Sequence, residues 1–147
     1  MTKRIMDYQE ALERLMSLAN FERSKTFPNH RSFHLERMAE LMGCLGNPHL
    51  KIPTIHVAGT KGKGSTAAII TSILSAQGLR VGLYTSPHLH RTVERIRIGL
   101  EPISQKDFAC LVYNIWPIVQ SVGKRGVHGE ITFLKCSPQW LLCILIT

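Results

Sequence analysis

The chain has 147 residues, enough for a single domain with a hydrophobic core. An apolar fraction of 44%, with two Trp, three Tyr and five Phe, is typical of a globular protein and excludes a disordered one. The net charge of +8 favours anionic ligands, but the Lys and Arg residues are scattered, so we expect a solvated basic surface and no nucleic-acid partner.

Cysteine spacing and hydropathy exclude further classes. Cys44, Cys110, Cys136 and Cys143 show neither a C-x-x-C pair nor paired spacing, so the sequence predicts no zinc site and no disulfide framework. The N-terminus lacks the apolar core of a secretory signal, and the longest apolar stretch, residues 140–146, is too short to span a bilayer. We therefore expect a cytoplasmic protein with reduced thiols and no membrane partner.

Two helices are predicted before residue 50. Asp7, followed three residues later by Glu10, resembles a capping box, and apolar residues at helical spacing follow over residues 8–19. Residues 21–33 are polar and typical of a loop. A second helix is predicted over residues 35–45, with Gly46 as its C-cap and Pro48 as a stop.

A β-α-β pattern occupies the centre of the chain. A short apolar run at residues 54–58 meets a glycine-rich stretch, and a helical pattern then runs to Gly78, before a second strand at residues 80–84. The glycines let successive backbone N–H groups converge on an anion, while the helix N-terminus and Lys63 add positive charge. This pattern predicts a nucleoside triphosphate site. Its spelling departs from G-x-x-x-x-G-K-[ST], because Val57 stands at the first glycine and the hydroxyl is displaced to Ser65. The alternative is an ordinary glycine-rich turn between strand and helix.

The β-α-β order predicts an α/β fold with a mainly parallel sheet flanked by helices. Residues 94–98 alternate polar and apolar, which indicates a half-exposed strand, and Ser104 with Asp107 caps a helix that Pro117 bends. Ligands of such sheets bind beyond the carboxyl ends of the strands. The glycine-rich stretch and the loop after residue 84 should therefore border one crevice.

Four ordered motifs resemble the dihydrofolate synthase / folylpolyglutamate synthase family of Mur-ligase-like, ATP-dependent amide ligases. They are HVAGTKGKGS at residues 56–65, GLYTSPHL at 82–89, ERIRI at 94–98 and EPI at 101–103. Residues 33–38 and 45–48 also match, and the resemblance covers about residues 8–133. It implies a partial P-loop central domain of the Mur-ligase type. It also implies addition of L-glutamate to dihydropteroate or folate through an acyl phosphate, with ATP and Mg²⁺, by a monomeric parent protein.

The resemblance also implies roles for individual residues. Lys63 takes the catalytic role, and Ser86 is the Mg²⁺ ligand. The pocket for folate is implied to include Pro87, His88, Leu89, Glu94 and Arg95, with Phe33, His34 and Leu35 as an early contact on the pterin side. The residues implied to hold the ATP phosphates are Gly59, Thr60, Lys61, Gly62, Lys63, Gly64, Ser65 and Thr66.

Simpler explanations stand beside these roles. Ser86 and Pro87 can form an ordinary turn, His88 with His90 can form a metal pair that lacks a third ligand, and Glu94 and Arg95 can belong to a solvated strand face. The chain also departs from the family pattern where Lys61 replaces a common Asn and where residues 98–101 lack an Asn-Gly turn. Two rival functions remain open: a Mur-type ligase for another carboxylate, and a nucleotide- or polyanion-binding module without chemistry.

The tail departs from the family most. Residues 1–133 match the N-terminal part of the ATP-binding domain, whereas residues 134–147 do not match. After Thr132 and Phe133 the family continues into Phe-Glu, whose Glu is implied to be a second Mg²⁺ ligand, and then an apolar helix. Here Pro138 interrupts any helix, and suitably chosen codons for the tail read Glu-Val-Leu-Thr-Ala-Met-Ala-Phe in a shifted frame. We therefore expect a single-base slip after Phe133 and an inactive, truncated product; a divergent short protein is the alternative.

Overall fold

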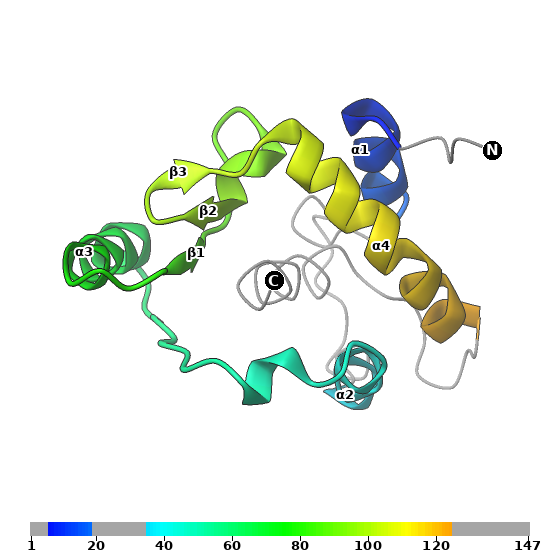
Figure 1. Ribbon diagram of the computed structural model, residues 1–147, viewed down its shortest axis with the longest axis horizontal. Coiled ribbons are helices and arrows are strands. Elements are labelled where there is room, and N and C mark those ends of the chain that lie inside the picture. Colours follow the sequence, from blue (N-terminus) through cyan, green and yellow to red (C-terminus); the bar gives the residue numbers. More distant parts are fainter. Residues whose placement is uncertain (1–5, 19–34, 125–147) are drawn as a thin grey trace.

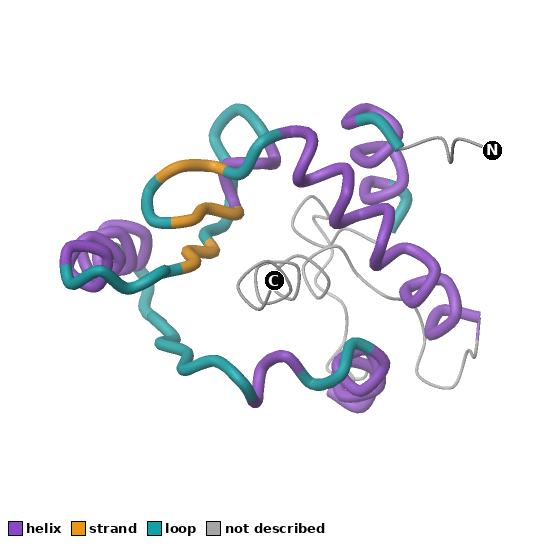
Figure 2. The backbone as a smooth tube through the Cα atoms, in the orientation of Figure 1, coloured by secondary structure: helices purple, strands orange, loops and turns teal. Residues whose placement is uncertain are grey.

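A computed structural model describes residues 6–18 and 35–124 (Figure 1). Helices dominate this part of the chain, and the strands form one small group (Figure 2). The predicted loop over residues 21–33 and the tail from residue 134 lie outside the described residues. The elements are α1 (Tyr8–Met16), α2 (Leu35–Cys44), the 3-10 helix η2 (Pro48–Leu50), α3 (Lys63–Ala76), β1 (Gly82–Tyr84), the 3-10 helix η3 (Thr92–Arg95), β2 (Ile96–Ile98), β3 (Glu101–Pro102) and α4 (Gln105–Lys124).

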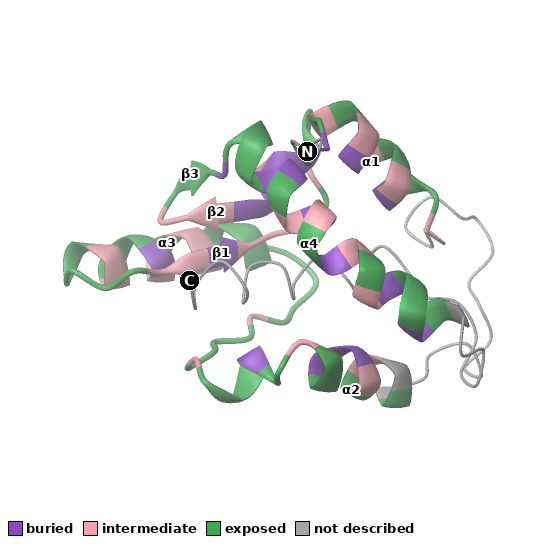
Figure 3. Cartoon of the chain, turned by 45° about the vertical axis from the view of Figure 1, so that its right-hand side comes forward, coloured by how far each residue is buried: buried purple, intermediate pink, exposed green. Residues whose placement is uncertain are grey.

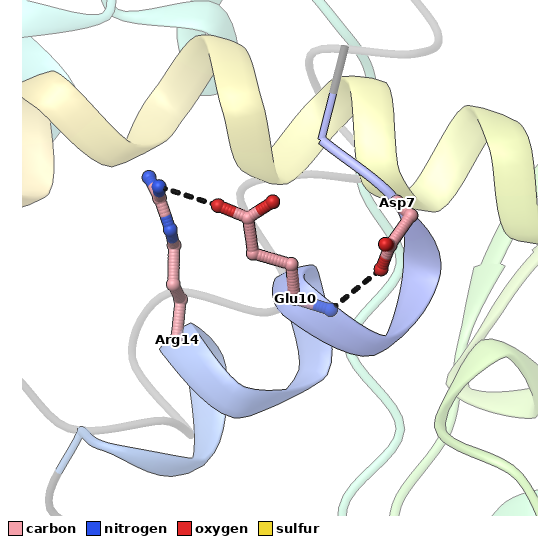
Figure 4. A network of polar contacts seen from close by, with 3 residues as sticks. All are labelled: Asp7, Glu10 and Arg14. Atoms are coloured by element: carbon pink, nitrogen blue, oxygen red, sulfur yellow. Dashed lines mark hydrogen bonds and ion pairs between the residues drawn. The ribbon is translucent and has the colours of Figure 1, made fainter. Parts of the chain in front are cut away.

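Side-chain caps begin the helices α1 and α4, as the sequence predicts. The N–H of Glu10 donates to Asp7 Oδ1 at 2.8 Å, and Arg14 then donates to Glu10 Oε1 at 2.8 Å (Figure 4). At α4 the N–H of Asp107 donates to Ser104 Oγ at 3.0 Å. Each such cap satisfies a backbone donor of the first turn and contributes about 1 kcal/mol.

The core lies where α1 packs against α4 (Figure 1). The ring of Tyr8 meets the ring of Phe108 edge to face, with centroids 5.5 Å apart. The buried residues of α4 recur every three or four positions, so they form one helical face, and burial is concentrated on such faces (Figure 3). The core residues shared by α1, α2 and α4 are Ala11, Leu15, Leu41, Phe108, Val112, Ile115, Val119 and Val122.

The three described strands form an antiparallel sheet in the order β1-β2-β3. Tyr84 pairs with Ile96, and Ile98 pairs with Glu101 across a two-residue turn that begins at Gly99. A φ of 60° at Gly99 suits the first turn position of a tight hairpin, where glycine is favoured. The hairpin therefore forms without the usual Asn-Gly pair.

The α/β class is confirmed, but a mainly parallel sheet is wrong for the described strands. The apolar run at residues 54–58 forms neither a strand nor a helix, and Ile55 is 62% exposed. A parallel strand needs neighbouring strands and cover on both faces, and the described residues supply neither to this run. The predicted strand at residues 94–98 begins two residues later, because residues up to Arg95 form η3.

Helix α3 lies at one side of the described chain, beside the sheet (Figure 1). It packs against β1, and Thr71 is its one buried residue, whereas Ile69 and Ile73 are 60% and 58% exposed. Residues 63–66, its first turn, are also exposed. In the part of the chain that the structure describes, no helix has the length and hydropathy needed to cross a membrane.

Candidate functional site

The phosphate loop, residues 59–66, is shaped by two glycines with positive φ. Gly59 has φ 152°, and Gly62 is the N-cap of α3 with φ 75° and ψ −2°. A Cβ at Gly62 would meet nothing within 4 Å, so the left-handed backbone, and not lack of space, makes glycine the favoured residue. At this left-handed residue the loop that follows residues 54–58 turns into the helix.

The charges around this loop suit an anion. The first three N–H groups of α3 have no partner within the helix, whereas the N–H of Thr66 donates to the Gly62 carbonyl at 3.0 Å. The first turn of α3 has no acidic residue, and residues 58–66 are all exposed. Lys63 Nζ donates to the Gly59 carbonyl at 2.7 Å and lies 3.4 Å from that of Thr60. An ammonium group and a helix N-terminus are thus held on the same short loop.

The second candidate region is the 85–91 loop, residues 85–91, which leaves β1. The N–H of Thr85 donates to the Arg95 carbonyl at 3.0 Å, and the peptide bond between Ser86 and Pro87 is cis. Ser86 and Pro87 are both exposed, so the Ser86 hydroxyl is accessible to a ligand.

Glu94 holds the end of the 85–91 loop. Its carboxylate accepts hydrogen bonds from the N–H groups of Leu89 at 3.0 Å, His90 at 3.3 Å and Arg91 at 2.9 Å. These bonds favour the ionised form, and those from Arg91 and then Leu89 do most to lower the pKa of Glu94 below its ordinary value. Glu94 stands three residues after Arg91, the spacing of a capping box, but Arg91 is not the Ser or Thr of that signature, so the sequence did not indicate this role.

Arg95 is 3% exposed, and its Nε donates to His88 Nδ1 at 2.8 Å. Because Nδ1 accepts this bond, it carries no proton, and any proton of the neutral ring lies on Nε2. The solvated strand face that the sequence left open is therefore wrong for Arg95. No cluster of three or more His, Cys, Asp or Glu that could hold a metal occurs among residues 6–18 and 35–124, which gives no support to a metal pair of His88 and His90.

The groove that the structure describes is formed by other residues than those of the two loops. A groove of about 760 Å³ lies beside β2, β3 and α4, and its polar lining includes Arg80, Glu101, Asp107 and Asn114 but no residue of either loop. Phe33 and His34 lie outside the described residues, and Leu35 is described only as the first residue of α2.

Comparison with known proteins decides the family. No family model matches the chain. A dihydrofolate synthase/folylpolyglutamate synthase of Bacillus subtilis is 46% identical over 98 residues, which are 67% of this chain and 23% of that protein. A putative folylpolyglutamate synthase of Dictyostelium discoideum is 39% identical over 121 residues, which are 76% of this chain and 19% of that protein.

Solved structures agree with the relatives. The folylpolyglutamate synthase of Thermotoga maritima superposes with a TM-score of 0.78 at 36% identity, over 93% of this chain and 30% of its own. A folylpolyglutamate synthase complex with AMPPCP and folate has a TM-score of 0.81 at 30% identity, over 96% of this chain and 32% of its own. Over the shared region, the chain belongs to the dihydrofolate synthase / folylpolyglutamate synthase family. It spans about a fifth to a third of the length of these family members.

Proposed function

We propose that the chain is the phosphate-loop part of an ATP-dependent ligase that adds L-glutamate to dihydropteroate or folate. The observation that carries the proposal is the phosphate loop, where Lys63 and the N-terminus of α3 meet on a glycine-shaped turn. Folylpolyglutamate synthases similar to this chain have been solved with ADP, AMPPCP and folate. In the proposed reaction, ATP phosphorylates a substrate carboxylate, and the amine of glutamate attacks the acyl phosphate.

The proposed roles follow the chemistry of each loop. The backbone N–H groups of the phosphate loop and the Lys63 ammonium would bind and neutralise the phosphates, which is most of what phosphoryl transfer requires. The Lys63 ammonium contacts the carbonyl groups of Gly59 and Thr60, and because an ammonium has three N–H donors, it could donate to a phosphate from this position. The 85–91 loop would contact the pteroate or folate substrate.

Mg²⁺ is the metal that this activity implies, and Ser86 is its proposed ligand. The exposed hydroxyl supplies an oxygen donor of the kind that Mg²⁺ binds, and Mg²⁺ commonly arrives with phosphate oxygens and water as its other ligands. Such an ion would offset phosphate charge during transfer. Because the described residues hold no cluster of three potential ligands, we propose that the nucleotide supplies most of the coordination and that this chain alone has negligible ligase activity.

Nucleotide binding by Lys63→Ala tests the proposal. A charge-assisted contact contributes about 1.5–3 kcal/mol, so the variant should bind ATP about tenfold or more weakly in calorimetry. Lys51→Ala, which removes an exposed lysine outside the phosphate loop, is the matched control and should bind ATP as the unmutated chain does. Equal weakening in both variants would contradict a nucleotide site.

That contrary result would favour a second function, a polyanion-binding module without chemistry, for which the net charge of +8 is the supporting observation. Binding by such a module would fall steeply with salt and would not depend on any single lysine. Conversely, ATP turnover by the 147-residue chain that depends on folate and glutamate would overturn the proposed lack of activity.

A further inference from the structure

Two consecutive residues of η3 hold the 85–91 loop from one side. Glu94 accepts from the backbone N–H groups of Leu89, His90 and Arg91, and Arg95 donates to the ring of His88. Four successive residues of the loop are therefore fixed by two neighbouring side chains. Both carboxylate oxygens of Glu94 and the Nε of Arg95 are engaged in bonds within the protein.

Glu94 is itself fixed at both its backbone groups. Its N–H donates to the Arg91 carbonyl at 3.0 Å, and its carbonyl accepts from Arg97 Nε at 2.9 Å. The carboxylate uses both oxygens, because Oε2 accepts from Leu89 and His90 while Oε1 accepts from Arg91. Bonds from several N–H groups to one carboxylate are stronger than bonds between neutral groups, so they order the loop before any ligand arrives.

The loop presents an apolar side chain on this fixed backbone. The Leu89 side chain is 85% exposed, more than any other large apolar side chain among the described residues, although its N–H is bonded to Glu94. A single exposed leucine needs no explanation by itself. Here, however, the bonds to Glu94 hold its Cα in place, so a ligand that packs against Leu89 need not first order the chain.

We propose that Glu94 is a positioning residue, which fixes Leu89 as an apolar contact for the flat ring system of a pteroate or folate and does not itself bind that ligand. This proposal rests on the proposed function and changes the roles of two residues in it. Glu94 and Arg95 hold the 85–91 loop in place, and Leu89 and its neighbours contact the substrate. Ligand affinity then depends on Glu94 through loop order, and on Leu89 through packing.

Amide hydrogen exchange separates these two effects. In Glu94→Ala, exchange at residues 89–91 should accelerate about tenfold or more, because the three N–H groups lose their acceptor. Glu94→Gln keeps one oxygen acceptor and should restore part of the protection. The matched control is Glu13→Ala, which removes an exposed carboxylate of α1 and should leave this exchange unchanged. Unchanged exchange in Glu94→Ala, with the helical circular dichroism of the chain intact, would overturn the positioning role.

Titration with folate then tests the contact. Leu89→Ala should weaken folate binding about tenfold while exchange at residues 89–91 stays slow, and Glu94→Ala should weaken binding with exchange fast. Leu50→Ala, at a leucine that is 77% exposed on η2, should change neither. Folate affinity unchanged by Leu89→Ala would overturn the contact. If the unmutated chain bound no folate, the proposed function and the role of Leu89 would both be contradicted, while exchange would still decide whether Glu94 holds the loop.

Discussion

Arg95 Nε lies 2.8 Å from His88 Nδ1. The buried guanidinium of Arg95 therefore orients the imidazole of His88, a residue of the 85–91 loop. The bond joins η3 to the 85–91 loop across seven residues of sequence. Both residues have further interactions, so each contributes to the structure beyond this bond.

A double-mutant cycle with His88→Ala and Arg95→Ala should give a coupling free energy of about 1.5–3 kcal/mol in urea unfolding, the usual net contribution of a hydrogen bond with a charged donor. The cycle cancels the other contacts of each residue. His49→Ala with Arg95→Ala is the control pair, because His49 is exposed on η2, and its coupling should be near zero. Additive effects of the first pair would contradict the bond.

Gly62→Ala should destabilise the chain by about 1–2 kcal/mol, because φ of 75° is costly for a residue with a Cβ. Gly43→Ala is the matched control. Gly43 lies in α2, where an added Cβ also meets nothing within 4 Å but φ is helical, so this variant should be neutral or more stable by up to about 1 kcal/mol. Chemical denaturation of both variants measures the difference, and equal effects would show that backbone conformation at Gly62 is not the constraint.

Order in the 85–91 loop should depend on acid pH. The N–H of Arg91, followed by that of Leu89, lowers the pKa of Glu94 below its ordinary value of 4.5. A lowered carboxylate pKa means that the stabilisation is complete above the unfolded-state value and is lost as pH falls through the folded-state value. The amide resonances of residues 89–91 should therefore titrate with a midpoint below 4.5. Glu94→Gln should abolish the titration, and a midpoint at or above 4.5 would contradict the bonds.

Phe108→Ala should lower the free energy of unfolding by about 3–5 kcal/mol, since the ring is fully buried and packs edge to face on Tyr8. Leu79→Ala removes a large apolar side chain that is 56% exposed and should cost far less, within about 1 kcal/mol. Urea unfolding followed by circular dichroism compares the two variants. Similar losses would mean that the contact of α1 with α4 is not the centre of the core.

The sequence predicted the helix starts and the buried helix face, because these features depend only on residues close in the chain. Asp7 and Ser104 begin helices because a cap needs only the next turn, and the period of α4 indicated which face is buried. The predicted strand at residues 54–58 did not form. An apolar run becomes a strand only when other strands lie beside it, and such strands are remote in sequence.

The candidate site was predicted to a similar extent. The turn at Gly62 and the helix after it follow from residues in direct succession, and both are confirmed. A shared crevice between the two loops stays a prediction, because the groove that the structure describes is lined by neither loop. A carboxylate such as that of Glu94 looks the same in sequence whether it binds a substrate or the backbone. The frameshift after Phe133 lies outside the described residues and remains a prediction, which the bases that follow the Phe133 codon would test.

The light burial of α3 has a thermodynamic consequence for the phosphate loop that precedes it. With Thr71 as its one buried residue, this helix has little packing energy to prevent local opening. A nucleotide that binds only the closed helix would shift that opening equilibrium by mass action. Part of the free energy of nucleotide binding would then be used to order α3. A substitution that packs α3 more firmly would therefore strengthen nucleotide binding without adding a contact to the ligand.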